Sequence, residues 1–509
     1  MVDSEYDVIV IGAGAIGENV ADRAVQGGMK TLIVEAELVG GECSYWACMP
    51  SKTLLRSATL LRAARKVGGV REAMTGDLDV QSVLQRRNAM VGNWKDDGQV
   101  AWLTGAGIEL LRGHARITAP REVTVGSAGA GSGIAVSTTV VRARHAVAVC
   151  TGSMPMLPDT PGLADVGPWT SRDATSAQAA PASLAIIGGG VVAVEMATAY
   201  AGFGTRVELI SRSGLLVREE PFAGELVRTS LEDLGVTLHP NETVTQARRT
   251  ASGRDTSGGG TGASARASTS GRTGTVELTL SSGRTLSVEH VLVATGRVPA
   301  TLDLGVETIG LTPGDWLPVD DTMLVTHDDN DALSGDWLYA AGDVNHRALL
   351  THQGKYQARI AGDAIAARAK GKTLPTAAWS TYVATADHAA VPQVTFTDPE
   401  VASVGLTAAS AQRAGYRIRV VDHPISGVAG ASINTDAYVG QARMIIDEDR
   451  GVLLGATFVG ADVGELLHSA TVAVVGEVPL ARLWHAVPSY PTLSEVWLRL
   501  LETYGRPTG

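Results

Sequence analysis

The sequence predicts an α/β fold built from two similar units, followed by a smaller α+β domain. Apolar runs at residues 7–11 and 184–187 each lead into a glycine-rich turn, a helical stretch (195–203 in the second unit) and a second apolar run. Strand, glycine turn, helix and strand together form a βαβ unit. From about residue 390 the pattern changes to short apolar strands around helical runs. We therefore expect two Rossmann-like dinucleotide-binding domains and an α+β C-terminal domain.

Composition limits the classes of function that are open to the chain. Its 509 residues, with a hydrophobic fraction of 45%, suffice for about three domains with large cores. The 42 basic and 53 acidic residues give a net charge of −11, which disfavours nucleic acid and anionic lipid as partners. The acidic N-terminus does not match a secretory signal, and no apolar run reaches the ~20 residues of a membrane span. Three cysteines exclude a disulfide scaffold and favour a reducing, cytoplasmic location.

The first glycine-rich turn contains Gly12, Gly14 and Gly17. This spacing allows a tight bend, close approach of a pyrophosphate to the backbone, and close packing of helix on strand. Glu35 stands 23 residues after Gly12, at the end of the next predicted strand. A carboxylate there can accept hydrogen bonds from a ribose hydroxyl pair. The turn is therefore predicted to bind a dinucleotide with a free 2′-hydroxyl, as in FAD.

The second turn carries Gly188, Gly190 and Ala193, and differs from the first in the residues beyond its second strand. Arg212 stands where the first unit has its acid, and Arg218 comes six residues later. Arginine can pair with a 2′-phosphate that a carboxylate would repel. We predict that this turn binds NADPH in preference to NADH. The alternative is that both arginines are ordinary surface residues.

Residues 251–274 contain no Val, Ile, Leu, Met or aromatic residue, and lie between strand-like runs at 241–249 and 275–280. Such a segment cannot bury enough apolar surface to offset the entropy of ordering. We predict a disordered hairpin insertion here. Residues 126–133 are interpreted as a smaller loop of the same kind.

The third domain is predicted from its own alternation of short apolar runs and helical stretches. The expected strands are Val394–Phe396, Arg417–Val421, Ala442–Asp447 and Val452–Val459, and the expected helices are 407–415 and 463–476.

Two of the three cysteines, Cys43 and Cys48, stand five positions apart in a stretch that begins a predicted helix. A zinc site would need two further Cys or His residues nearby, and the segment offers none. The pair is therefore interpreted as redox-active. Cys150 lies in an apolar, strand-like run and is predicted to be a small buried residue.

These motifs together resemble those of the flavoprotein disulfide reductases, the FAD-dependent pyridine nucleotide-disulfide oxidoreductases. That family includes dihydrolipoamide dehydrogenase, glutathione reductase, mercuric reductase and soluble transhydrogenase. The resemblance runs along nearly the whole chain. It rests on GAGAIG at 12–17, CSYWAC with PSK at 43–52, TGS at 151–153, GGGVVAVE at 188–195, ATGRVP at 294–299, AAGDV at 340–344, FTDPEVASVG at 396–405 and YPTLSE at 490–495.

The resemblance implies a domain organisation and a homodimer. It places a discontinuous FAD-binding domain at residues 1–155 and 298–375, an NAD(P)H-binding domain at 156–297, and a dimerisation domain at 385–509. In this family the C-terminal segment completes the partner's site. The chain is accordingly expected to be a homodimer.

The resemblance also implies roles for individual residues. Asp343 would hold the flavin ribityl chain, and Lys52 and Glu195 would form an ion pair near the flavin. The residues implied in FAD binding are Gly12, Gly14, Gly17, Glu35, His114, Ala115, Thr151, Gly152, Asp343, Leu350 and His352. Those implied in NADPH binding are Gly188, Gly190, Ala193, Arg212, Arg218 and Gly296.

The implied reaction is a two-step relay. NADPH would reduce the flavin, which would pass two electrons to a disulfide between Cys43 and Cys48 and on to a disulfide or other small-molecule acceptor. Cys48 would be the thiolate that faces the flavin, and Cys43 the exchanging thiol. Thiolates do this chemistry, so the site must lower the pKa of at least one cysteine.

The sequence departs from the thiol-reducing members near its C-terminus. Those members carry a histidine before Pro-Thr and a glutamate five residues after it, which together act as the base. Here Tyr490 replaces the histidine and Glu495 is retained. Tyrosine, with a pKa near 10, is a poor general base at pH 7. The missing histidine weakens the prediction of dihydrolipoamide dehydrogenase-type activity. His485 could take the place of that histidine if its loop folds back.

Other interpretations stay open at this point. In one, the flavin alone transfers hydride to a quinone or a nicotinamide, and the cysteines are not essential. In another, FAD is structural and the chain is a redox-regulated binding protein, against which the retained cysteine pair argues. The absence of a C-terminal cysteine pair disfavours dedicated Hg(II) reduction.

Overall fold

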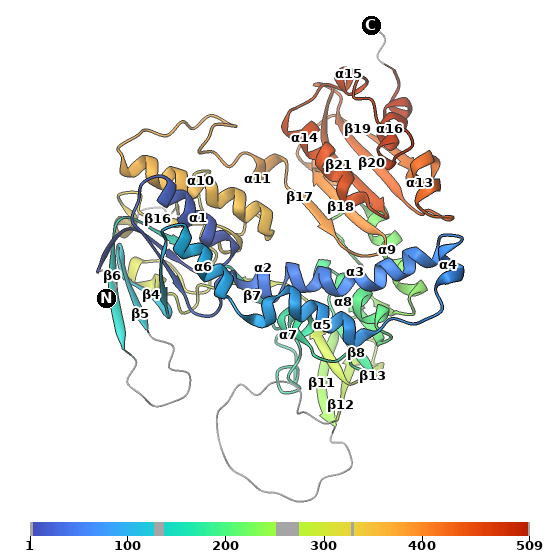
Figure 1. Ribbon diagram of the computed structural model, residues 1–509, viewed down its shortest axis with the longest axis horizontal. Helices are drawn as coiled ribbons and strands as arrows, with labels where there is room; N and C mark the ends of the chain where they lie inside the picture. The colour runs from blue at the N-terminus through green and yellow to red at the C-terminus, as the bar shows by residue number, and fades with distance from the viewer. Residues whose placement is uncertain (1–3, 127–136, 251–273, 327–329, 507–509) are drawn as a thin grey trace, which may run out of the picture.

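The computed structural model describes residues 4–126, 137–250, 274–326 and 330–506. Figure 1 shows three bodies: the first unit with both of its chain segments, the second unit, and the C-terminal domain, with long helices between them. The α/β class expected from the sequence is confirmed. The insertion predicted at 251–274, except Gly274, and the loop predicted at 126–133, except Gly126, lie outside the described residues.

A seven-stranded sheet forms the first body, in the order β3-β2-β1-β6-β5-β4, with β16 paired to β6. Strand β1 is buried on both faces, as expected of a parallel strand in an α/β sheet. Ile9 and Ile11 pack into one core, while Val8 and Val10 pack with helices α1 and α10 in another. The elements are β1 Glu5–Ile11, α1 Ala15–Gln26, β2 Thr31–Glu35, α6 Asp97–Gly105, β3 Glu109–Arg112, β4 His114–Ala119, β5 Glu122–Gly126, β6 Thr138–Val149, β16 Leu338–Ala340 and α10 Thr351–Ala369.

The second body contains a parallel sheet of order β10-β9-β8-β14 and an antiparallel sheet β11-β12-β13. The helix expected over 195–203 begins earlier, at Val191, directly after the glycine turn. The valines at 191 and 192 prolong the preceding apolar run, so the sequence pattern does not show this earlier start. The elements are β8 Ser183–Ile187, α8 Val191–Gly202, β9 Arg206–Ser211, α9 Pro221–Asp233, β10 Thr237–Pro240, β11 Val244–Thr250, β12 Thr275–Leu280, β13 Thr285–Val288 and β14 His290–Val293.

A short ribbon joins the first two bodies. Strands β7 (Ser153–Pro155) and β15 (Arg297–Pro299) pair antiparallel, with Met154 opposite Val298. The chain leaves the first body through β7 and returns through β15. The expected boundaries at 155/156 and 297/298 both fall at this ribbon, and the exact division stays a prediction.

The C-terminal body is an antiparallel sheet of order β17-β18-β21-β20-β19 with helices packed on it. Strand β18 was not expected as a strand, because its Ala, Ser and Gly residues give a weak apolar signal. The helix expected at 463–476 is a 3₁₀ turn, η7 (Val463–Leu466), followed by α14. The elements are β17 Pro392–Thr395, β18 Glu400–Gly405, α12 Ala408–Arg413, β19 Ile418–Pro424, α13 Ala429–Asn434, β20 Gln441–Asp447, β21 Val452–Gly460, α14 Leu467–Val475, α15 Leu480–Leu483 and α16 Val496–Tyr504.

Helix α3 (Cys48–Arg65) belongs to the first unit by sequence but packs on the second. Leu54 and Leu55 share a core with α8, and a Cβ atom on Gly202 of α8 would come within 2.6 Å of the Ala58 Cβ. Figure 1 shows α3 running from the first body to beneath the C-terminal domain. This helix brings the cysteine segment to the junction of all three bodies. The remaining helices of this region are α2 Gly41–Tyr45, α4 Val70–Ala73, α5 Val80–Met90, α7 Ser171–Ser176 and α11 Ala386–Ala389.

Candidate active site

The first glycine turn is shaped by two glycines that the fold requires and one that leaves room. Gly12 has φ +98°, and a Cβ atom there would lie 2.6 Å from the carbonyl oxygen of Cys150. A Cβ atom on Gly17 would lie 1.8 Å from the carbonyl oxygen of Gly12. A Cβ atom on Gly14, the N-cap of α1, would meet only the Cα atom of Gly41, at 3.9 Å. The start of α1 is therefore open, which suits a pyrophosphate.

Glu35 closes the far side of this turn. Its carboxylate accepts from the backbone N–H groups of Ala13 and Glu37, both at 2.7 Å. Burial raises the pKa of Glu35 above its usual value. The strand that holds His114 and Ala115 passes close by, since Gly113 donates its N–H to the backbone carbonyl of Glu35 at 2.9 Å. The His114 imidazole points elsewhere, to Asp303 at 3.2 Å.

The loop between β9 and α9 folds back over the second turn. Leu216 donates its backbone N–H to the carbonyl of Gly189 at 2.8 Å. A Cβ atom on Gly188 would lie 2.3 Å from the carbonyl oxygen of Ala294, whereas one on Gly190 would meet nothing within 4 Å. Ala193 is fully buried in α8. Ala193, at the third position of the turn, is thus packed in the core, whereas Gly190, at the second position, leaves space for a ligand.

The two arginines predicted for NADPH lie in this loop. Arg212 directly follows β9, is exposed, and makes no hydrogen bond or ion pair within the described part of the chain. Arg218 is also exposed, and lines a pocket between the second body and strands β17 and β18. Arg212 is not among the residues that line this pocket. Gly296, with φ +153°, lies against the Met156 side chain.

The thiols of Cys43 and Cys48 hydrogen-bond to each other across the break between α2 and α3. Cys48 is the first residue of the 18-residue helix α3, and its Sγ lies 3.3 Å from Thr351 Oγ1. The hydrogen bond with Cys43 is the main cause that lowers the pKa of Cys48, to about 6, and Thr351 and Lys52 lower it further. The same hydrogen bond, together with burial, raises the pKa of Cys43. Thr351 and Lys52 therefore both favour the thiolate form of Cys48.

Lys52 and Glu195 form an ion pair one turn along α3. Lys52 Nζ lies 2.8 Å from Glu195 Oε2, and the Glu195 side chain is 4% exposed. Glu195 Oε1 also accepts the backbone N–H of Phe396 at 2.9 Å. Lys52 Nζ lies 4.9 Å from the centre of the Phe396 ring. One carboxylate on α8 therefore holds α3 and the segment between β17 and β18 together.

The segment that would face the flavin contains a carboxylate and an unsatisfied hydroxyl. Asp343 Oδ2 accepts from Ser153 Oγ at 2.5 Å, and Arg297 Nε lies 3.7 Å from the same oxygen. Among the described residues, the buried Thr151 Oγ1 has no hydrogen-bond partner. A Cβ atom on Gly152 would meet nothing within 4 Å. A buried hydroxyl without a partner is costly, so this corner fits a polar ligand such as a flavin.

The start of α10 completes this side of the site. Leu350 is its N-cap residue and supplies no side-chain cap. His352 Nε2 donates to the carbonyl of Pro392 at 2.7 Å, which directs the imidazole toward β17. Thr351, between them, was not singled out in the sequence. Its contact with Cys48 joins residues 303 positions apart, and no local sequence motif predicts this contact.

The C-terminal residues stand apart from the thiols within one chain. Tyr490 is 78% exposed, and no hydrogen bond among the described residues links it to Cys43 or Cys48. Glu495 is buried, yet its Oε2 atom has no partner in this part of the chain. His485 is exposed. Cys150 is buried as predicted, and burial raises its pKa to about 12.

A half-buried pair of cysteines at the junction of two dinucleotide-binding units is typical of a flavin- and nicotinamide-dependent oxidoreductase. The chain belongs to the pyridine nucleotide-disulphide oxidoreductases. The model of that family matches residues 6–367, and the model of its dimerisation domain matches residues 391–500. Members of this family bind FAD and a pyridine nucleotide.

Named relatives cover nearly the whole chain. Dihydrolipoyl dehydrogenase of Haloferax volcanii is 29% identical, covering 97% of this chain and 95% of the relative. Dihydrolipoyl dehydrogenase of Thermus scotoductus is 31% identical, covering 96% and 95%. Mercuric reductase of Staphylococcus aureus is 27% identical, covering 97% and 81%.

Solved structures share the fold. The flavoprotein disulfide reductase RclA from Escherichia coli superposes with a TM-score of 0.77 at 23% identity, covering 98% of this chain and 99% of that one. LpdA from Mycobacterium tuberculosis gives a TM-score of 0.76 at 21% identity, covering 99% and 100%. Of the helices in the described segments, none has the length and apolar character needed to cross a bilayer.

Proposed function

We propose that the chain is an NADPH-dependent FAD oxidoreductase that passes electrons from nicotinamide through the flavin to a Cys43–Cys48 disulfide, and on to a disulfide or other small acceptor. The observation that carries this proposal is the half-buried cysteine pair at the start of α3, with Cys48 Sγ 3.3 Å from Thr351 Oγ1. The pKa of Cys48 is lowered to about 6 and that of Cys43 is raised. Two electrons and one proton added to the disulfide would leave Cys48 as thiolate and Cys43 as thiol.

The residues of the first unit fit FAD. Gly14 and Gly152 leave space at the backbone, and the Thr151 hydroxyl lacks a partner in the described structure. Asp343 would hold the ribityl hydroxyls, with Ser153 and Arg297 orienting its carboxylate. Thr351 would steady the Cys48 thiolate, and Lys52 would supply positive charge whose position Glu195 fixes. Charge near the flavin ring tunes its electronics.

NADPH is proposed over NADH on the strength of Arg212. Arg212 directly follows β9, where the first unit has the acidic Glu35 that is expected to meet a ribose. No other described residue pairs with the Arg212 guanidinium. A free arginine there can take a 2′-phosphate bidentately. Arg218 supports the preference less directly, since it lines a pocket toward the third body.

We propose a homodimer in which the C-terminal segment meets the partner's dithiol. Tyr490 is exposed, and the buried Glu495 Oε2 has no hydrogen-bond partner among the described residues of one chain. A matching dimerisation domain supports this arrangement. A reactive dithiol that must be re-reduced suits a cytoplasmic location.

Tyr490 also favours a second candidate function. Without a histidine base the exchanging thiol loses its usual proton acceptor. The chain would then reduce a quinone or a nicotinamide at the flavin, with the cysteines not essential.

Anaerobic titration with NADPH separates the two functions. A working dithiol takes up two electron pairs per FAD, and Cys48→Ser should take up one. Cys150→Ser is the matched control, because this buried thiol lies outside the pair, and it should still take up two. Uptake of only one electron pair by both the unmodified protein and Cys48→Ser would exclude the dithiol relay and support the flavin-only function.

A further inference from the structure

A buried carboxylate links the segment before the third body to the loop that carries Asp343. The side chain of Asp387, in α11, is 1% exposed. Its Oδ1 atom accepts from Gln353 Nε2 at 2.6 Å, and its Oδ2 atom accepts from Gln357 Nε2 at 3.0 Å. Arg347 Nη1 lies 3.5 Å from Oδ2. Both oxygens are thus occupied by the side-chain amides of α10.

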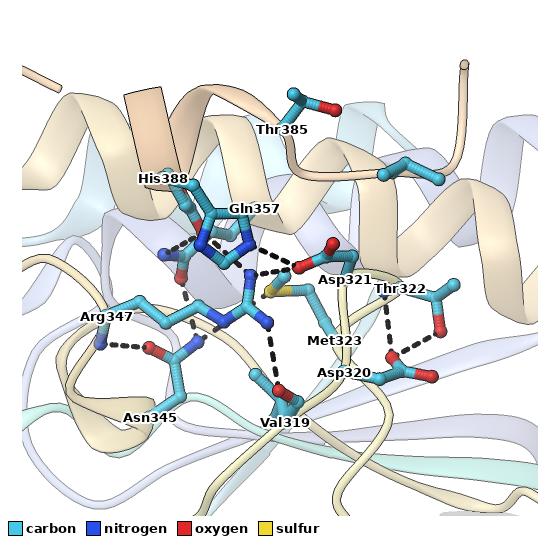
Figure 2. A network of polar contacts seen from close by, with 12 residues as sticks. Val319, Asp320, Asp321, Thr322, Met323, Asn345, Arg347, Gln357, Thr385 and His388 are labelled. Atoms are coloured by element: carbon cyan, nitrogen blue, oxygen red, sulfur yellow. Dashed lines mark hydrogen bonds and ion pairs between the residues drawn. The ribbon is translucent and has the colours of Figure 1, made fainter. Parts of the chain in front are cut away.

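The other end of the Gln357 amide reaches the turn before Asp343. Gln357 Oε1 accepts the backbone N–H of Gly342 at 2.9 Å and the side-chain amide of Asn345, also at 2.9 Å. Asn345 Oδ1 in turn accepts the backbone N–H of Arg347 at 3.0 Å. Figure 2 shows Gln357 above Asn345 and Arg347, joined to them by this network. Gly342 has φ +82°, a backbone conformation that glycine adopts readily and other residues rarely do.

These contacts allow only one orientation of the Gln357 amide. A backbone N–H can only donate, so the carbonyl oxygen of the amide must face Gly342. An ionised carboxylate can only accept, so the NH₂ group must face Asp387. If Asp387 became a donor, the amide would be pulled toward the opposite orientation, and the Gly342 N–H would face another donor.

We propose that Asp387 is a positioning residue for the flavin site, which acts by fixing the amide of Gln357 and through it the Gly342–Asp343 backbone. The inference rests on the proposed role of Asp343 in holding the flavin. Asp387 would not touch the flavin itself. It would hold the turn in the geometry that directs the Asp343 carboxylate toward the ribityl chain.

A pair of substitutions that exchange donor and acceptor tests this inference. In Asp387→Asn the new NH₂ group faces the NH₂ groups of the α10 amides, so donor meets donor. In Gln357→Glu the new carboxylate faces the Asp387 carboxylate, so acceptor meets acceptor. Each single variant of the holoenzyme should raise the FAD dissociation constant about tenfold, the effect of one lost hydrogen bond. Each should also shift the flavin midpoint potential.

The double variant restores a matched donor and acceptor. The amide introduced at position 387 can donate to the carboxylate introduced at position 357, which still accepts from Gly342 and Asn345. The FAD dissociation constant should therefore return to within about threefold of the starting value.

Asp321→Asn is the matched control. Asp321 belongs to the same network but bonds Arg347 at 2.8 Å and His388 at 2.7 Å, rather than the amides (Figure 2). Its FAD dissociation constant should stay within about twofold of the unmodified protein's. If a single variant does not fold, recovery of both folding and FAD binding in the double variant supports the inference.

Two results would overturn it. One is wild-type FAD affinity in both single variants. The other is a double variant whose affinity loss is the product of the two single losses. Asp343→Ala, measured in parallel, tests the assignment beneath the inference. If Asp343→Ala keeps full affinity for FAD, the proposed flavin site is wrong. If Asp343→Ala loses affinity but the Asp387 and Gln357 variants keep it, the flavin site is supported and the positioning role of Asp387 is wrong.

Discussion

The Sγ atom of Cys48 lies 3.3 Å from the Oγ1 atom of Thr351, which begins helix α10. The hydroxyl is one of three neighbours that lower the pKa of this thiol, with Cys43 the largest contributor and Lys52 the smallest of the three. Side chains from three different elements thus favour the Cys48 thiolate. The side chains come from α2, α3 and α10.

Thr351→Val should raise the pKa of Cys48 above about 6, because the nearly isosteric side chain lacks the hydroxyl that donates to the thiolate. The pH dependence of iodoacetamide alkylation, with Cys48 identified by mass spectrometry, measures this pKa. Thr351→Ser keeps a hydroxyl and should leave the profile near its starting position. Identical profiles for all three proteins would show that the hydroxyl does not act on the thiol.

Glu18→Gln should stabilise the protein at pH 8 and much less at pH 5. Glu18 is buried, its Oε1 atom has no partner in the described structure, and burial raises its pKa from 4.5 to about 7. The folded protein therefore binds the proton more tightly than the unfolded chain. The contribution of Glu18 to the free energy of unfolding is full below pH 4.5 and is lost as the pH rises through 7. The loss amounts to about 3 kcal/mol.

Urea unfolding of the FAD-free protein at pH 5 and pH 8 measures this effect. The difference between Glu18→Gln and the unmodified protein cancels the titration of all other groups. Equal stability gains at the two pH values would contradict a raised pKa for Glu18.

Arg212→Ala should lower kcat/KM for NADPH about tenfold and leave kcat/KM for NADH nearly unchanged. The guanidinium is expected to meet only the 2′-phosphate, which NADH lacks. Arg218→Ala should have a smaller effect, since Arg218 lines the pocket next to the third body. A kcat/KM ratio of NADPH over NADH near one or below in the unmodified protein would overturn the preference itself.

Lys52→Met should cost more stability than Glu195→Gln. Removal of Lys52 leaves the Glu195 carboxylate, 4% exposed, without its cation. Such a change costs about 3–5 kcal/mol in fully buried pairs. We expect about 2 kcal/mol here, because the Lys52 side chain is 34% exposed and solvent screens the pair.

Glu195→Gln should cost less, about 1 kcal/mol, since the amide oxygen can still accept the N–H of Phe396. Urea midpoints of the two variants give the comparison. A larger loss in Glu195→Gln would mean that packing, rather than the unpaired charge, determines the cost.

Tyr490→His should raise the turnover of a small disulfide substrate at pH 7 by about 10²-fold. Imidazole can act as general base at this pH and a phenol cannot. His485→Ala serves as the test of the alternative base, and should leave turnover unchanged if the His485 loop does not fold back. No gain in Tyr490→His would favour the flavin-only function.

Much of this architecture could be predicted from local signals. The turns at Gly12 and Gly188 lie between strands and helices as expected, and Lys52 and Glu195 form the ion pair that the motifs implied. The contacts that were missed join distant segments without a motif. Thr351 meets Cys48 through packing of α10 against the cysteine segment, and Glu18 is buried although its first-turn position in α1 is typical of exposed acids.

The loop that carries Arg212 and Arg218 is a second case in which tertiary contacts could not be predicted from the sequence. Their sequence positions predict one phosphate site, and that prediction stays open. The fold adds what the sequence did not indicate: the loop that carries them folds over Gly189, and Arg218 lines a pocket with residues of β17 and β18. Only the tertiary contacts decide which surface each arginine reaches.

The two thiols are separated by only four residues, and one of these, Trp46, is held by two side chains of α7. Thr175 donates its hydroxyl to the carbonyl of Trp46 at 2.7 Å, and the Arg172 guanidinium lies 4.2 Å from the centre of the Trp46 ring. The proposed disulfide between Cys43 and Cys48 would therefore close a very small ring, for which the entropy of closure is low. Such a bond would form and break with only local movement of the backbone, while the rest of the molecule keeps its shape.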